Sequence, residues 1–244
     1  MDFYILLISF FIIALVYSSV GFGGGSSYLA LMGVMAVPMT AMRPTALLCN
    51  IVVVTGGTII FYREKFLDWK NCWPFLAVSI PAAFLGGYWP IKENTFFVLL
   101  GGTLIVASFF LWFQGSESKN VKSSNLVLNL GLGGGIGFLS GLVSIGGGIF
   151  LSPILHFLKW DLARKISALA SLFILVNSIS GLAGQFLQAG SVDLKFAVPL
   201  LLAVLAGGQV GSRLGARTFN PKYIKRITAV LILAAGANIL KSHW

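Results

Sequence analysis

The stretch Gly21-Phe22-Gly23-Gly24-Gly25-Ser26-Ser27 joins an uninterrupted apolar segment to a shorter one, and Ser144-Ile145-Gly146-Gly147-Gly148 does the same in the second half of the chain. Glycine is unfavourable inside a regular helix, but it allows sharp turns and the close approach of other backbone. Three glycines in a row within a hydrophobic region therefore predict a break at which unpaired amides line a cavity. Broken helices at corresponding positions of two halves are the best sequence indication of a transport site. The two triplets predict a transporter built by duplication.

Composition places the chain in a membrane. Of its 244 residues, 57% are hydrophobic and only 10% are charged, and the mean hydropathy is +0.91. A helix needs about 20 residues to cross a hydrocarbon core of roughly 30 Å. We therefore expect an all-helical, multi-pass integral membrane protein. Eight segments reach or approach the length of a crossing, namely residues 3–20, 47–62, 73–89, 95–113, 126–143, 166–187, 194–211 and 224–240.

Two shorter apolar segments, residues 26–37 and 149–158, directly follow the glycine triplets. At about 1.5 Å per residue, neither reaches across a membrane alone as a helix. We expect each to form a hairpin with the long segment before its triplet. The sequence thus predicts two repeats, each a glycine-turned helical hairpin followed by three transmembrane helices.

Positive charge is distributed unevenly over the loops. The net charge is +10, which in a soluble protein would favour nucleic acid, but Lys and Arg in short loops between spans set membrane orientation instead. If each half contributes an odd number of full crossings, 13 of the 17 Lys and Arg residues fall on one side and 4 on the other. Parallel repeats with an even number would divide them 7 to 10. The positive-inside rule therefore favours inverted repeats, and nucleic acid is not an expected partner.

A comparison of the two halves also indicates duplication. A shift of 123 positions lays the first triplet on the second, and Gly86-Gly87 falls close to Gly207-Gly208. The polar stretch 114–125 is a natural linker, so residues 1–113 are expected to form the first repeat and residues 126–244 the second, within one membrane domain. The alternative is a chance alignment of glycines in a chain that contains 29.

The chain resembles a known family in both halves. The motifs that carry the resemblance are Gly21-Phe22-Gly23-Gly24-Gly25, Pro38, Ala46-Leu47-Leu48-Cys49-Asn50, residues 141–148, Pro153 and residues 167–173. They are similar to those of the TauE/SafE family of membrane permeases, over essentially the whole chain. The resemblance implies a bacterial or archaeal inner-membrane permease that exports sulfite or moves sulfoacetate and other small organosulfur anions. It does not distinguish among these substrates.

Charged side chains are missing from the interior of the apolar spans. The seven acidic residues all fall at span ends or in loops. Transporters that relay protons commonly bury a carboxylate, and an enzyme needs a cluster of titratable or metal-binding groups. The two His residues are isolated, and neither Cys has the spacing of a metal ligand. We therefore expect neither an enzyme nor a bound cofactor or metal.

Backbone amides and neutral polar side chains remain as candidate binding groups, and these suit a small anion. Free amides and the positive end of the helix dipole occur at helix N-termini, where anions bind. Two hairpin tips that meet near the membrane midplane would direct two such ends at one ion. The alternative is that these small residues only allow close helix packing. The candidate binding residues at the tips are Gly23, Gly24, Gly25, Ser26, Ser27, Ser144, Gly146, Gly147 and Gly148.

The helix after each hairpin supplies the other candidates: Arg43, Thr45 and Asn50 in the first half, and Ser171 and Asn177 in the second. Arg43 is expected near the outer end of the first hairpin, where it attracts the anion or only anchors the helix at the lipid headgroups. Each Asn either lines the pathway or is satisfied by a neighbouring helix. Gln185 lies late in its span and either lines the pathway or extends to the membrane surface; we favour the latter.

These observations predict a secondary transporter or uniporter for a small anion. The resemblance implies that the anion contains sulfur, as sulfite or an organosulfonate such as sulfoacetate, and that it is exported across the cell inner membrane. Its expected partners are the anionic substrate and the lipid bilayer, and a homo-oligomer is left open. The alternative is a membrane scaffold or accessory subunit that transports nothing. Paired helix breaks argue against a scaffold, which has no need for irregular backbone within the membrane.

Overall fold

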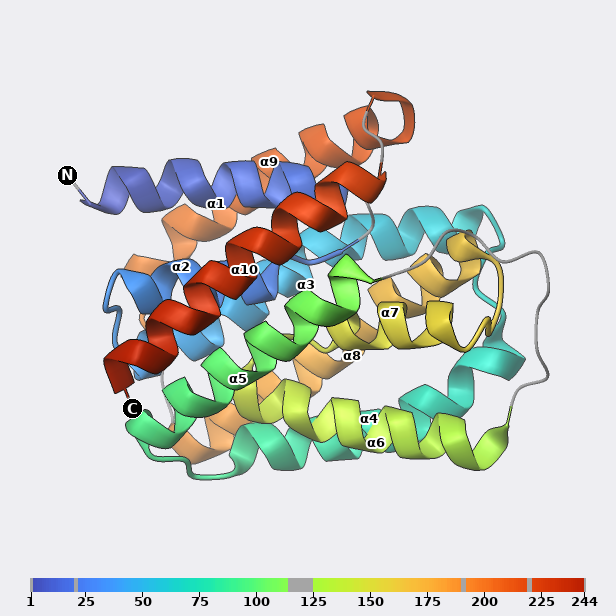
Figure 1. Cartoon of the computed structure of the whole chain (residues 1–244), viewed down its shortest axis with the longest axis horizontal. Helices are drawn as coiled ribbons and strands as arrows, with labels where there is room; N and C mark the ends of the chain where they lie inside the picture. The colour runs from blue at the N-terminus through green and yellow to red at the C-terminus, as the bar shows by residue number, and fades with distance from the viewer. Residues whose placement is uncertain (1, 20–21, 114–124, 190–191, 219–220, 244) are drawn as a thin grey trace.

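Figure 1 shows the computed structural model of the chain, which describes residues 2–19, 22–113, 125–189, 192–218 and 221–243. All regular structure in these residues is helical, which confirms the predicted fold class. The helices are α1 (Asp2–Ser18), α2 (Gly25–Val34), α3 (Met39–Arg63), α4 (Trp69–Tyr88), α5 (Glu93–Trp112), α6 (Leu126–Val143), α7 (Gly148–Phe157), α8 (Ala163–Ala189), α9 (Leu194–Thr218) and α10 (Pro221–His243).

Each predicted apolar segment corresponds to one of these helices within a few residues at its ends, the short segments to α2 and α7. Within the described residues, five helices (α3, α5, α6, α8 and α9) are long and apolar enough to cross a membrane. Large apolar side chains such as Ile8, Leu202 and Leu231 are exposed on the outside of the bundle. A water-soluble protein rarely exposes apolar surface on that scale. The chain is therefore a multi-pass membrane protein.

The glycine triplets break the helices where the sequence predicts. Gly24 and Gly147 cap the N-termini of α2 and α7 with φ of +81° and +82°. A side chain in this left-handed region costs roughly 1–2 kcal/mol, which glycine avoids. Ser144, which ends α6, adopts φ +64° although it is not a glycine. The chain therefore turns sharply at both triplets, and α2 and α7 begin directly after the turns.

Helix α3 begins earlier than its apolar run indicates. Pro38 is its N-cap residue, and the backbone carbonyl of Pro38 accepts hydrogen bonds from the amides of Ala41 and Met42 at 3.0 Å. Pro44 lies inside its second turn. Arg43 is consequently a residue of a packed helix, and only 5% of its surface is exposed. This burial argues against the alternative that Arg43 only anchors the helix at the lipid headgroups.

The packing of the helices repeats between the two halves of the chain. Helix α1 packs on α9, and α6 packs on α4; α3 packs on α9, and α8 packs on α4. Helices α3 and α8 also pack on each other, as do α5 and α10. Each helix of the first half has a counterpart five places later, so that α1 corresponds to α6 and α4 to α9. When every helix is replaced by its counterpart, the same set of packed pairs results. Backbone contacts at Gly141 with Ala83 and at Gly87 with Gly181 bring α4, α6 and α8 close together.

The ends of the helices sort to two sides of the bundle (Figure 1). The N- and C-termini lie at the left of the view, with the segments that join α2 to α3 and α4 to α5. The segments that join α3 to α4 and α7 to α8 lie at the right. Helix α1 begins at the left, whereas α6 begins at the right. The predicted linker, residues 114–125, lies outside the described residues except for Asn125.

Candidate functional site

The two glycine triplets meet around the side chain of Asn50. Asn50 lies in α3 and is fully buried, and its Nδ2 donates a hydrogen bond to the backbone carbonyl of Ile145 at 3.0 Å. A Cβ added to Gly25 would lie 2.8 Å from the same carbonyl oxygen, and a Cβ on Gly146 would lie 2.8 Å from Asn50 Nδ2. A Cβ on Gly23 would lie 2.6 Å from Asn50 Oδ1. Glycine at positions 23, 25 and 146 therefore allows the two triplets to approach each other and α3 this closely.

The described residues of the two tips are in direct contact in this arrangement. Residues 22–30 and 143–153 are all buried, and neither of the two pockets described below is lined by a residue of a triplet. The tips are adjacent, as the sequence predicts, but they are in direct contact. An anion held between the two helix N-termini stays a prediction.

Arg43 is a buried cation without an anionic partner among the described residues. Its Nε donates to Ser144 Oγ at 3.3 Å, and its Nη2 donates to the carbonyl oxygen of Leu142 at 3.2 Å. Its guanidinium carbon lies 5.6 Å from the ring centre of Phe96. Within the described residues the sole ion pair joins other side chains, near the start of α8. These contacts orient the guanidinium, but none of them neutralises its charge.

Gln185 completes this group from the far end of α8. Its Nε2 donates to Ser144 Oγ at 2.8 Å, and 6% of its surface is exposed. Its Oε1 is buried and has no hydrogen-bond partner among the described residues. The interpretation that Gln185 extends to the membrane surface was therefore wrong. Ser144 accepts hydrogen bonds from both Arg43 and Gln185, and thereby joins α3, α6 and α8.

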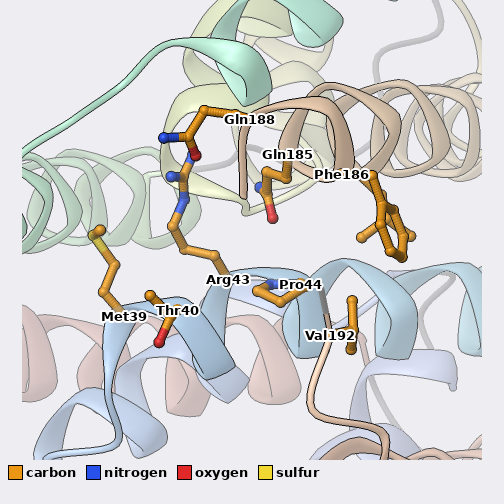
Figure 2. Close-up of a pocket in the computed structure, with 9 residues that line it drawn as sticks. Met39, Thr40, Arg43, Pro44, Gln185, Phe186, Gln188 and Val192 are labelled. Carbon is orange, nitrogen blue, oxygen red and sulfur yellow. The ribbon is translucent and has the colours of Figure 1, made fainter. Parts of the chain in front are cut away.

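A pocket of about 50 Å³ opens beside this group. Figure 2 shows Arg43 reaching from α3 toward the end of α8, where Gln185 and Gln188 lie. Phe186 and Val192 close another side of the pocket. Its volume suits a few water molecules or a small ion. The residues that line it are Met39, Thr40, Arg43, Pro44, Leu182, Gln185, Phe186, Gln188 and Val192.

A second pocket, of about 20 Å³, lies farther along α3. At about 1.5 Å per residue, Arg43 and Gly57 are each roughly 10 Å from Asn50 along the helix axis, in opposite directions. The tip contact at Asn50 therefore lies between the two pockets along α3. The residues that line the second pocket are Ser18, Phe22, Val52, Val53, Val54, Gly56, Gly57, Ser171, Leu205, Gly208, Gln209 and Ser212.

The remaining predicted residues do not share one site. Ser171 lines the second pocket, and its hydroxyl oxygen lies 2.9 Å from Thr58 Oγ1 across the contact between α3 and α8. Ser27 Oγ is 2.6 Å from the hydroxyl of Tyr17, so it serves the packing of α2 on α1. Ser26 is buried as well.

Thr45 and Asn177 are buried, and their side-chain polar atoms have no hydrogen-bond partner among the described residues. Neither residue lines a described pocket. Sequence reasoning missed Ser178, whose hydroxyl a Cβ on Gly146 would approach to 3.2 Å. Ser178 could have been identified from its position, because it is a polar residue next to Asn177 within an apolar span.

Comparisons with known proteins agree with this architecture. The model of the sulfite exporter TauE/SafE family matches residues 6–239. The chain is 32% identical to probable membrane transporter protein y4hK of Sinorhizobium fredii, across 96% of this chain and 97% of the relative. It is 26% identical to probable membrane transporter protein YjnA of Bacillus subtilis, across 97% and 98% of the two chains. No solved structure matches the chain.

The match to the family model covers nearly the whole chain, including both triplets, Arg43, Ser144 and Gln185. The relatives that span the same length are named as membrane transporters. The chain is a multi-pass membrane protein of the sulfite exporter TauE/SafE family.

Proposed function

We propose that this protein is a secondary transporter or uniporter that moves a small sulfur-containing anion, sulfite or an organosulfonate such as sulfoacetate, out of the cell across the inner membrane. The observation that carries the proposal is the buried charge of Arg43, which has no ion-pair partner among the described residues, at the edge of a pocket between α3 and α8. The name of the matching family supports sulfite as a member of the substrate class.

A buried cation supports a binding function because it is costly to maintain. Charged residues within membrane spans are rare, and they mark substrate or ion pathways. Arg43 makes two hydrogen bonds to oxygen atoms, yet it has no carboxylate partner among the described residues. An anion in the adjacent pocket would supply the missing negative charge. The guanidinium also suits an oxyanion, because its parallel N–H groups match two oxygens of one head group.

The arrangement of the two pockets supports a pathway along α3. The Arg43 pocket lies toward the start of α3 and the second pocket toward its end, with the contact between the tips in between. We infer that the tips form the barrier between the two sides of the membrane and that they separate when the anion passes. The exchange of packing pairs between halves and the opposite starting ends of α1 and α6 support two inverted repeats, residues 1–113 and 126–244.

Membrane potential favours export. It is worth about 2.3 kcal/mol per unit charge per 100 mV, so an inside-negative cell expels a monovalent anion without a second ion. The described residues that line the two pockets include no Asp or Glu, which fits a pathway that does not relay protons through a carboxylate.

Flux in proteoliposomes tests the proposal. Purified protein should move at least one anion of a panel that contains sulfite, sulfate, thiosulfate, sulfoacetate and taurine faster than liposomes without protein do. The rate should follow an imposed voltage at equal pH on both sides. Absence of flux for the whole panel would favour the scaffold interpretation. Flux that ignores voltage but follows a proton or sodium gradient would contradict uniport.

A further inference from the structure

The Arg43 pocket contains one charge and one unsatisfied acceptor. Among its described lining residues Arg43 is the only charged side chain, so the pocket neutralises a single negative charge. Gln185 Oε1 is buried and has no hydrogen-bond partner among the described residues. In Figure 2 the carboxamide of Gln185 extends from α8 toward α3, with its oxygen on the side nearer Pro44. A ligand in the pocket therefore meets a cation and a hydrogen-bond acceptor together.

Ser144 determines which end of the Gln185 carboxamide is left for the ligand. Its hydroxyl oxygen accepts one hydrogen bond from Arg43 Nε and one from Gln185 Nε2. A hydroxyl oxygen has two lone pairs, so both are occupied. Because Gln185 Nε2 is engaged in this way, the oxygen of the carboxamide is the end left without a partner among the described residues. Ser144 is thus a positioning residue for both side chains.

We propose that the pocket selects a singly charged oxyanion that carries a hydrogen-bond donor of its own, with the anionic oxygens on Arg43 and an O–H or N–H group on Gln185 Oε1. This inference rests on the proposed function, whose site it describes, and it narrows that substrate class to monoanions with a donor such as hydrogen sulfite, against the sulfite and sulfoacetate dianions. A buried acceptor left unpaired is unfavourable, and a ligand that donates to it removes that penalty. Sites built to hydrogen-bond a substrate hydroxyl reject analogues that lack it. A dianion without a donor brings a second charge that no second cation neutralises, and it leaves Gln185 Oε1 unpaired.

Two stable probes test this preference. 2-Hydroxyethanesulfonate and ethanesulfonate have the same anionic head group and differ by one hydroxyl group. Isothermal titration of the detergent-solubilised wild-type protein should show 2-hydroxyethanesulfonate binding about tenfold more tightly, as expected for one hydrogen bond to a buried acceptor. Gln185→Met, which keeps the length of the side chain but removes the acceptor, should bind the two probes equally. Asn94→Leu, a change to an exposed amide in the first turn of α5, should retain the preference.

The outcomes separate this inference from the proposed function. Equal binding of the two probes by the wild type, or tighter binding of ethanesulfonate, would overturn the inference and leave an Arg43-dependent anion site in place. A preference that persists in Gln185→Met would also overturn it. Failure of both probes to bind the wild type, or undiminished binding of both to Arg43→Gln, would reject the anion site itself and the inference with it. The wild-type comparison needs no variant, so a poorly folded mutant does not prevent the test.

Discussion

Replacement of Gly25 by alanine should force the two hairpin tips apart. A Cβ at this position would lie 2.8 Å from the backbone carbonyl oxygen of Ile145, whereas ordinary contact begins at 3.4 Å. The new methyl group would also overlap Asn50 Nδ2, whose hydrogen bond to that carbonyl holds the tips together. A side chain can rotate away, but a backbone carbonyl cannot. The tips must therefore move by about 0.6 Å, and the Asn50 hydrogen bond lengthens.

The expected cost follows from these contacts. Overpacking of a tight interior costs typically 1–3 kcal/mol, and a weakened buried hydrogen bond adds about 1 kcal/mol. If 1–3 kcal/mol of this cost falls on the arrangement with the tips in contact, the equilibrium shifts toward separated tips by roughly 5- to 150-fold. Cys49, the buried free thiol next to Asn50, offers a reporter of this separation.

The assay is the rate of alkylation of Cys49 by a small permeant thiol reagent, in a background with Cys72→Ser. Gly25→Ala should raise this rate within the stated range. Gly102→Ala is the matched control, because Gly102 lies within α5 and a Cβ there would meet nothing within 4 Å. Equal alkylation rates and equal anion flux in Gly25→Ala and Gly102→Ala would refute the assignment of the tips as a barrier.

Three further predictions concern orientation, packing and the second pocket. A single cysteine that replaces Lys65 should be protected from impermeant reagents in intact cells, whereas one that replaces Lys92 should be labelled, because the charge distribution places Lys65 in the cytoplasm. The reverse pattern would mean that the orientation is inverted. Gly141→Val should lower the melting temperature in detergent, because its Cβ would overlap the carbonyl of a facing helix, whereas Gly135→Val has open space and should not. Ser171→Ala should lower stability by only about 0.6–1.7 kcal/mol, the range of interhelical hydrogen bonds in membranes, and should preserve anion selectivity; loss of selectivity would assign Ser171 to the binding site.

The sequence predicts the helical architecture well because its signals are local. The apolar lengths and the two glycine triplets are read within one segment at a time, and Gly24 and Gly147 adopt the conformation that only glycine takes without cost. Helix α3 begins at Met39, ahead of the apolar run 47–62, because Pro38 caps the helix and its first two turns include Arg43 and Pro44, which an apolar run leaves out.

The site was less predictable because its contacts join distant parts of the chain. Gln185, Ser144 and Arg43 meet through the packing of α8, α6 and α3, and nothing near Gln185 in the sequence indicates that meeting. Asn50 was identified as a candidate, but its hydrogen bond to Ile145 joins residues 95 positions apart. Which polar residues of a span face one another depends on helix rotation, and a single sequence does not fix that rotation.

Charge movement by a monovalent anion is the most direct test of the Arg43 site. Proteoliposomes adsorbed on a capacitive electrode and exposed to 2-hydroxyethanesulfonate should give a transient current with the wild-type protein. Arg43→Gln should abolish that current, whereas Arg63→Gln, a change to the exposed last residue of the same helix, should retain it. A current of equal size in Arg43→Gln and the wild type would contradict the anion site at Arg43.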